Sequence, residues 1–142
     1  MGGTEERVYF KKTKVKTKNN ADMNSNQIDT KGIEVKRVGM VIKLRPECVE
    51  EYLELHADSN SGVRDLLAKY HLKNFSIFIH QIGNDWFEFG YYEYTGADYE
   101  TDLSTLSSEP RNKAWLEICD PMQLPLDGEN GWAQMRQVYY NA

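Results

Sequence analysis

The order in which strand and helix patterns follow one another is the feature that most constrains how this chain folds. Apolar residues alternate at the two-residue period of a strand in some segments and recur at helical spacing in others. The predicted strands cover residues 38–44, 74–80, 86–94 and 132–140. The order strand, helix, strand, strand, helix, strand predicts a ferredoxin-like α+β domain with an antiparallel four-stranded sheet and helices on one face.

The predicted helical regions begin and end at typical helix signals. Pro46 suits a first helical turn, and the acidic residues that follow it favour a helix N-terminus. Residues 58–62 then interrupt the pattern, so this region is either one helix with a weak centre or two short helices. Another helix is predicted after Gly96. Ser108 is the expected N-cap of a last helix, which is expected to end at Pro121.

The charge divides the chain into a tail and a body. Residues 1–34 hold seven basic and five acidic residues and few aliphatic ones, whereas the other 108 residues carry a net charge of -7. We therefore predict a flexible basic tail over residues 1–34, as a solvated extension or a polyanion-binding segment, and a folded domain over 35–142. An acidic body argues against nucleic acid as the main partner.

Several classes of protein lack support in the sequence. No apolar run is long enough to span a membrane, and the N-terminus has no secretory signal pattern. Cys48 and Cys119 belong to no metal-binding motif, and reduced thiols are typical of a cytoplasmic protein. The three histidines show no metal-ligand spacing, and no phosphate loop or nucleophile elbow is present. We expect no metal and no cofactor.

Tyr52 and His56 form the most promising local arrangement. They stand four residues apart on the predicted helix, with Val49 and Leu53 on the same face, so their side chains lie over one another. Histidine titrates near neutral pH and transfers protons, and a phenol can orient a hydroxylated ligand. Alternatively, His56 is a core histidine bonded to a backbone carbonyl and Tyr52 simply packs. Aromatic residues crowd 86–94 and recur at Trp115; rings of this kind line sugar sites but also favour strands.

The chain resembles the L-rhamnose mutarotases over roughly residues 35–140. The segment 38–47, the run Glu50-Glu51-Tyr52 and His56 are similar to that family's strand, proline-opened helix, E-E-Y and histidine. The likeness continues at 72–78, at Ala114-Trp115, Asp120 and Met122, and at the ending 136–140.

This resemblance implies a homodimer of the dimeric α/β-barrel type that interconverts sugar anomers without a cofactor. It implies that His56 is the catalytic proton donor and Tyr52 a substrate-binding residue. Phe75 falls on a second substrate-contacting tyrosine, whose hydroxyl is missing here, and Ala114 and Trp115 fall on a pair of sugar-holding tryptophans. The family's N-P-x-W-P-E-L run is replaced by residues 57–63. These departures favour L-fucose or another deoxyhexose over L-rhamnose alone.

The expected chemistry is the opening and reclosing of a hemiacetal by groups that exchange protons near pH 7. Asp58 and Asp120 are candidates for a second acid or base. Two alternatives remain open at this point: a non-catalytic dimeric α+β barrel that binds a small ligand or a partner protein, and a cofactor-free monooxygenase of related architecture. A further expectation is an isologous homodimer, because two helical regions cannot cover both faces of the sheet.

Overall fold

The computed structural model describes residues 27–28 and 34–142. The predicted tail lies outside these residues apart from 27–28 and Glu34. The strands are β1 (Gln27–Ile28), β2 (Glu34–Leu44), β3 (Leu72–Ile82), β4 (Asp85–Tyr94), β5 (Gln123–Leu124) and β6 (Ala133–Met135). The helices are α1 (Val49–Leu55), α2 (Arg64–Lys69), α3 (Tyr99–Ser108) and α4 (Pro110–Cys119), with short 3-10 turns η1 (Pro46–Cys48) and η2 (Asp120–Met122).

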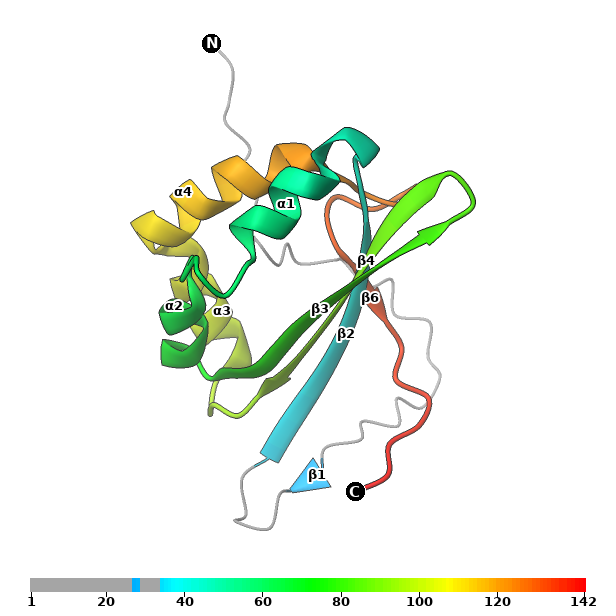
Figure 1. Ribbon diagram of the computed structural model, residues 1–142. Coiled ribbons are helices and arrows are strands. Elements are labelled where there is room, and N and C mark those ends of the chain that lie inside the picture. The colour runs from blue at the N-terminus through cyan, green and yellow to red at the C-terminus, as the bar shows by residue number, and fades with distance from the viewer. Residues whose placement is uncertain (1–26, 29–33) are drawn as a thin grey trace.

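The sheet has the strand order that the sequence predicts. Strand β2 pairs antiparallel with β4, and β4 pairs antiparallel with β3. The short strands β5 and β6 both pair antiparallel with β2, at residues 43–44 and 39–41 respectively. The order β6-β2-β4-β3 confirms the ferredoxin-like prediction. The four helices gather on one side of the curled sheet (Figure 1).

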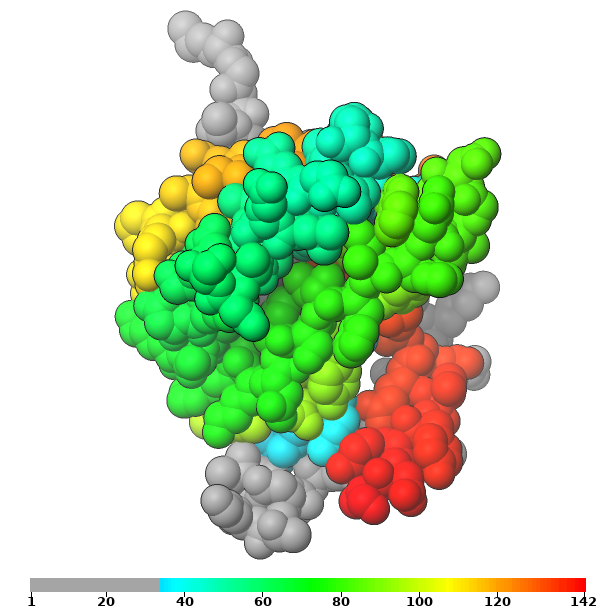
Figure 2. Space-filling model, viewed as in Figure 1, coloured from blue at the N-terminus to red at the C-terminus, as the bar shows by residue number. Residues whose placement is uncertain are grey.

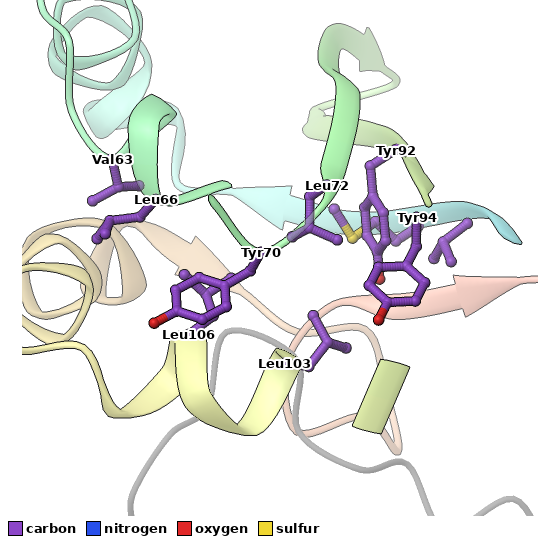
Figure 3. Close-up of a cluster of buried hydrophobic side chains, with 10 residues drawn as sticks. Val63, Leu66, Tyr70, Leu72, Tyr92, Tyr94, Leu103 and Leu106 are labelled. Atoms are coloured by element: carbon purple, nitrogen blue, oxygen red, sulfur yellow. The ribbon is translucent and has the colours of Figure 1, made fainter. Parts of the chain in front are cut away.

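Alternation along the strands gives the sheet one face toward the helices and one face away from them. The helix-side face carries a core cluster built from β2, β3, β4, α2 and α3, most of which is labelled in Figure 3. A second, smaller cluster lies where α1 meets the far ends of β2 and β4. It consists of Leu44, Val49, Tyr52 and Met122, against which Cys48, Leu55, Ile79 and Trp86 pack.

The open face of the sheet is apolar too. Phe78 on β3 is 66% exposed, and its cross-strand partner is Phe89 on β4. Phe89 stacks on Phe87, with the ring centroids 6.3 Å apart. The helices therefore leave an aromatic surface uncovered on this copy of the chain.

Three predicted details are wrong. The last strand is expected over 132–140, but β6 ends at Met135, because the residues beyond Ala133 are mostly exposed and bury no alternating face. Residues 136–142 run along one side of the molecule, away from the helices (Figure 2). Ser108 ends α3, where its hydroxyl donates to the Ser104 carbonyl, and Glu109 is the residue before α4. Leu53 is 47% exposed and so lies off the buried face of α1.

The interrupted helical region forms two short helices, one of the two predicted outcomes. Helix α1 ends at Leu55, α2 begins at Arg64, and the turn between them contains Gly62 at φ +52°. That left-handed conformation favours glycine and lies in the turn that separates α1 from α2. The break leaves His56 at the C-terminal end of α1, at the start of the connecting loop.

Candidate active site

The rings of Tyr52 and His56 lie face to face at the end of α1. Their centroids are 4.0 Å apart and their planes differ by 23°. Tyr52 is 3% exposed and belongs to the smaller core cluster, while His56 is partly buried above it. The four-residue spacing thus produces the predicted stack, in which the tyrosine ring packs against one face of the imidazole.

One hydrogen bond fixes the protonation pattern of His56. Its Nδ1 lies 2.8 Å from the backbone carbonyl oxygen of Tyr52. A carbonyl only accepts, so Nδ1–H donates, and the other ring nitrogen, Nε2, is the acceptor of the neutral imidazole. Burial lowers the pKa of His56 below its usual 6.5, the Tyr52 hydrogen bond opposes this, and the Arg64 guanidinium lowers it further. His56 is therefore a neutral base near pH 7.

Arg64 fastens the loop that follows His56. Its guanidinium donates to the carbonyl oxygens of His56 and Ala57 at 3.0 and 3.3 Å. It also pairs with Asp58 at 3.2 Å, on the exposed side of the loop. Since the Asp58 side chain is fully solvated, nothing holds that carboxylate against the imidazole. Asp120, the other candidate for a second acid or base, is partly buried in η2.

Trp115 comes to His56 from α4, 59 positions along the chain. The two rings meet edge to face at 5.3 Å between centroids. The same indole lies over Gly62, where an added Cβ would stand 3.2 Å from the indole Cη2. Ala114, in contrast, is exposed on α4. The structure thus brings Tyr52, His56 and Trp115 together, and Ala114 contributes no large surface beside them.

Phe75 reaches the helix side of the sheet through a β-bulge. Lys73 pairs with Glu93 and Ser76 with Tyr91, so Asn74 and Phe75 together oppose Tyr92. Asn74 has φ +52°, as a bulge allows. The Phe75 ring stacks on Tyr92 at 5.4 Å with an interplanar angle of 8°. Phe75 packs against the larger core cluster, as Trp115 does.

Sequence reasoning missed one residue of this region, Glu88 on β4. Its side chain is 0% exposed, faces the helices and approaches both Tyr52 and Gln123. The side-chain amide of Gln123 donates to both carboxyl oxygens at 3.4 Å. Burial raises the pKa of Glu88 to about 7, while bonds from Tyr52 and Gln123 hold it down. The signal was an acid between Phe87 and Phe89, at a position that alternates in phase with the buried Tyr92 and Tyr94.

A comparison of the sequence with known protein families adds to this geometry. The sequence model described as L-rhamnose mutarotase matches residues 37–141. The chain belongs to the L-rhamnose mutarotase family. As a member, it is an isomerase of the aldose mutarotase type, as the resemblance implies.

A comparison with solved structures agrees with the fold. The crystal structure of an L-rhamnose mutarotase from Formosa agariphila is similar to this mutarotase-family chain with a TM-score of 0.55 at 20% identity. The match covers 75% of this chain and 99% of that one, and at this identity it shows a shared fold. No curated protein matches the chain. Among the described residues, no helix is both long and apolar enough to cross a membrane.

Proposed function

We propose that the chain interconverts the α and β anomers of a deoxyhexose such as L-rhamnose or L-fucose, and that His56 moves the proton. The observation that carries this proposal is the hydrogen bond from His56 Nδ1–H to the Tyr52 carbonyl. It presents Nε2 as a proton acceptor in a neutral ring. Family membership indicates the reaction, and this hydrogen bond supports His56 as the residue that transfers the proton.

One imidazole is sufficient for both proton transfers. Nε2 takes the proton of the anomeric hydroxyl, the bond between the anomeric carbon and the ring oxygen breaks, and a carbonyl forms at that carbon. The imidazolium returns the proton to the former ring oxygen. Because both oxygens start on the same carbon, a single nitrogen reaches both. Rotation about the adjacent bond, followed by the reverse steps on the other carbonyl face, gives the second anomer.

The aromatic residues around His56 suit a sugar. We propose that Trp115, partly buried and edge-on to His56, offers a flat apolar surface to the C–H groups of the ring. Tyr52 is proposed to contact substrate through its ring, since its hydroxyl is buried away from solvent. Phe75 and Ala114 are proposed to line the sugar site without donating a hydrogen bond, which leaves room for a sugar other than L-rhamnose.

We further propose that the chain acts as a cytoplasmic homodimer without a cofactor, joined through the open face of the sheet. The exposed Phe78 and its neighbour Phe89 form an aromatic surface there. Both cysteines are free thiols, which suits a reducing compartment.

Anomer-exchange NMR on L-rhamnose, L-fucose and other deoxyhexoses tests the function. We expect exchange above the buffer rate, and a loss of about 10²–10⁴-fold in His56→Ala. The matched control is His80→Ala, since His80 is exposed on β3. Thermal melts of both variants separate loss of chemistry from loss of fold. A stable, active His56→Ala variant would refute the mechanism, and no enhancement with any sugar would favour a ligand-binding module.

A further inference from the structure

A buried carboxyl group stands directly behind the Tyr52–His56 stack. Glu88 accepts hydrogen bonds from the Gln123 amide on β5, and the buried hydroxyl of Tyr52 on α1 lies on the side of the same carboxyl group. Its cross-strand neighbours on β2 and β3 are Ile42 and Ile79, which give it no polar support. An acidic side chain with 0% exposure is costly to bury unless it is bonded.

The linkage continues from Glu88 to the reacting nitrogen through only one residue. The hydroxyl end of Tyr52 is buried on the side of Glu88. Its ring lies against the His56 ring, and its carbonyl oxygen accepts from His56 Nδ1. A shift of Tyr52 therefore moves both the surface under the imidazole and the group that fixes its tautomer.

Resting on the proposed function, we propose that Glu88 is a positioning residue for the mutarotase reaction, which acts on His56 through Tyr52. The carboxylate form accepts a hydrogen bond from the Tyr52 hydroxyl, whereas the neutral acid can donate one to it. The two forms thus hold the phenol differently. Glu88 touches no substrate in this scheme, since it is fully enclosed.

The surroundings of Glu88 allow both forms near neutral pH. The titratable groups close to it are Tyr52 from α1 and the Cys119 thiol from α4, and Asp120 also acts on that thiol. Burial, Asp120 and Glu88 raise the pKa of Cys119 to about 12, so the thiol stays neutral. Among the described residues, no cation contributes to the shift of Glu88, whose pKa of about 7 is set mainly by burial.

Two variants of the full chain separate positioning from bulk packing. Glu88→Gln keeps the shape and one accepting oxygen but does not ionise, whereas Glu88→Leu removes every polar atom of the side chain. We expect exchange about three- to tenfold slower in Glu88→Leu, in the turnover number rather than in KM, and a smaller loss in Glu88→Gln. If Glu88→Leu fails to fold, Glu88→Gln still decides.

The deciding measurement follows the Tyr52 and His56 ring resonances by NMR from pH 5 to 9, without sugar. In the unchanged chain we expect two inflections, one from His56 and one from Glu88. In Glu88→Gln we expect only the first. Identical curves in both proteins would overturn the role of Glu88.

This readout does not depend on turnover, so it stands apart from the proposed function. Exchange of L-rhamnose and L-fucose by the unchanged chain tests that function separately. If the ring titrations show the Glu88 inflection but the chain exchanges neither sugar, the proposed function is refuted, and the mutarotase role of Glu88 is refuted with it. If the chain exchanges a sugar but the ring titrations are the same in Glu88→Gln, only the positioning role of Glu88 is refuted.

Discussion

The imidazole of His56 rests on the phenol ring of Tyr52 at 4.0 Å and donates from Nδ1 to the carbonyl of the same residue. One residue therefore supports the histidine from below and selects its tautomer. Sequence spacing predicts the stack, since both side chains lie on one helix face. The hydrogen bond adds the chemistry, because it makes Nε2 the acceptor.

The acid side of the pH–rate profile should have its midpoint below 6.5. Burial lowers the pKa of His56, so the neutral base persists below the pH at which an exposed histidine is half protonated. NMR titration of the His56 ring, assigned by its loss in His56→Ala, measures this directly. Arg64→Gln should raise the pKa, because the guanidinium disfavours the imidazolium. A value at or above 6.5 in the unchanged chain would contradict the neutral-base mechanism.

Gly62→Ala should displace Trp115 and slow anomer exchange. The new Cβ would stand 3.2 Å from the indole, and the backbone at φ +52° disfavours any side chain by about 1–2 kcal/mol. Gly83→Ala is the matched control, since Gly83 has φ +62° with no atom within 4 Å of its added Cβ. Tryptophan fluorescence and exchange rates should change in the first variant only. Equal effects in both would show that the Gly62–Trp115 contact is unimportant.

Glu88→Gln should make folding stability less sensitive to rising pH. Burial raises the folded-state pKa of Glu88 from 4.5 to about 7, so between these values only the unfolded chain loses the proton. This contribution is complete below pH 4.5 and is lost as pH rises through 7, amounting to roughly 3 kcal/mol. Urea unfolding at pH 5, 6, 7 and 8 should show the two proteins diverging in this direction. Parallel curves would mean that Glu88 ionises freely in the folded chain.

The sequence predicts the sheet order and the Tyr52–His56 pair because both follow from local periodicity. It does not predict contacts that depend on how helices return to the sheet. Trp115 approaches His56 from a helix far along the chain, and Glu88 meets Tyr52 across the sheet–helix interface. The bulge that aims Phe75 at Tyr92 depends on one positive φ at Asn74, which carries no strong sequence signal. The predicted length of the last strand is wrong for a related reason, because the apolar residues that follow β6 are exposed.

Phe78→Asp should dissociate the proposed homodimer. Phe78 is 66% exposed in the single chain, and a charge there would be buried without a partner if the open faces of two copies meet. Ile118→Asp is the control, because Ile118 is 47% exposed on the helix side. Sedimentation should give twice 16.5 kDa for the unchanged chain and for the control, and a monomer for Phe78→Asp. A 16.5 kDa species from the unchanged chain at micromolar concentration would exclude the dimer.

Phe75→Tyr should raise activity toward L-rhamnose relative to L-fucose. A site that hydrogen-bonds a substrate hydroxyl discriminates strongly, and the phenylalanine at this position cannot do so. We therefore expect the unchanged chain to use another deoxyhexose as well as L-rhamnose or better. The control is Phe89→Tyr, which places the same hydroxyl on the opposite face of the sheet.

The stack of Phe75 on Tyr92 decides how the outcome is interpreted. If the far edge of the Phe75 ring faces the sugar, the added hydroxyl gains a partner and the sugar preference changes. If that edge faces the core cluster, the hydroxyl is buried unpaired and costs about 1–3 kcal/mol of folding stability. Exchange rates for both sugars, measured beside urea unfolding, distinguish the two. A destabilised variant with unchanged sugar preference would show that Phe75 belongs to the core and not to the sugar site.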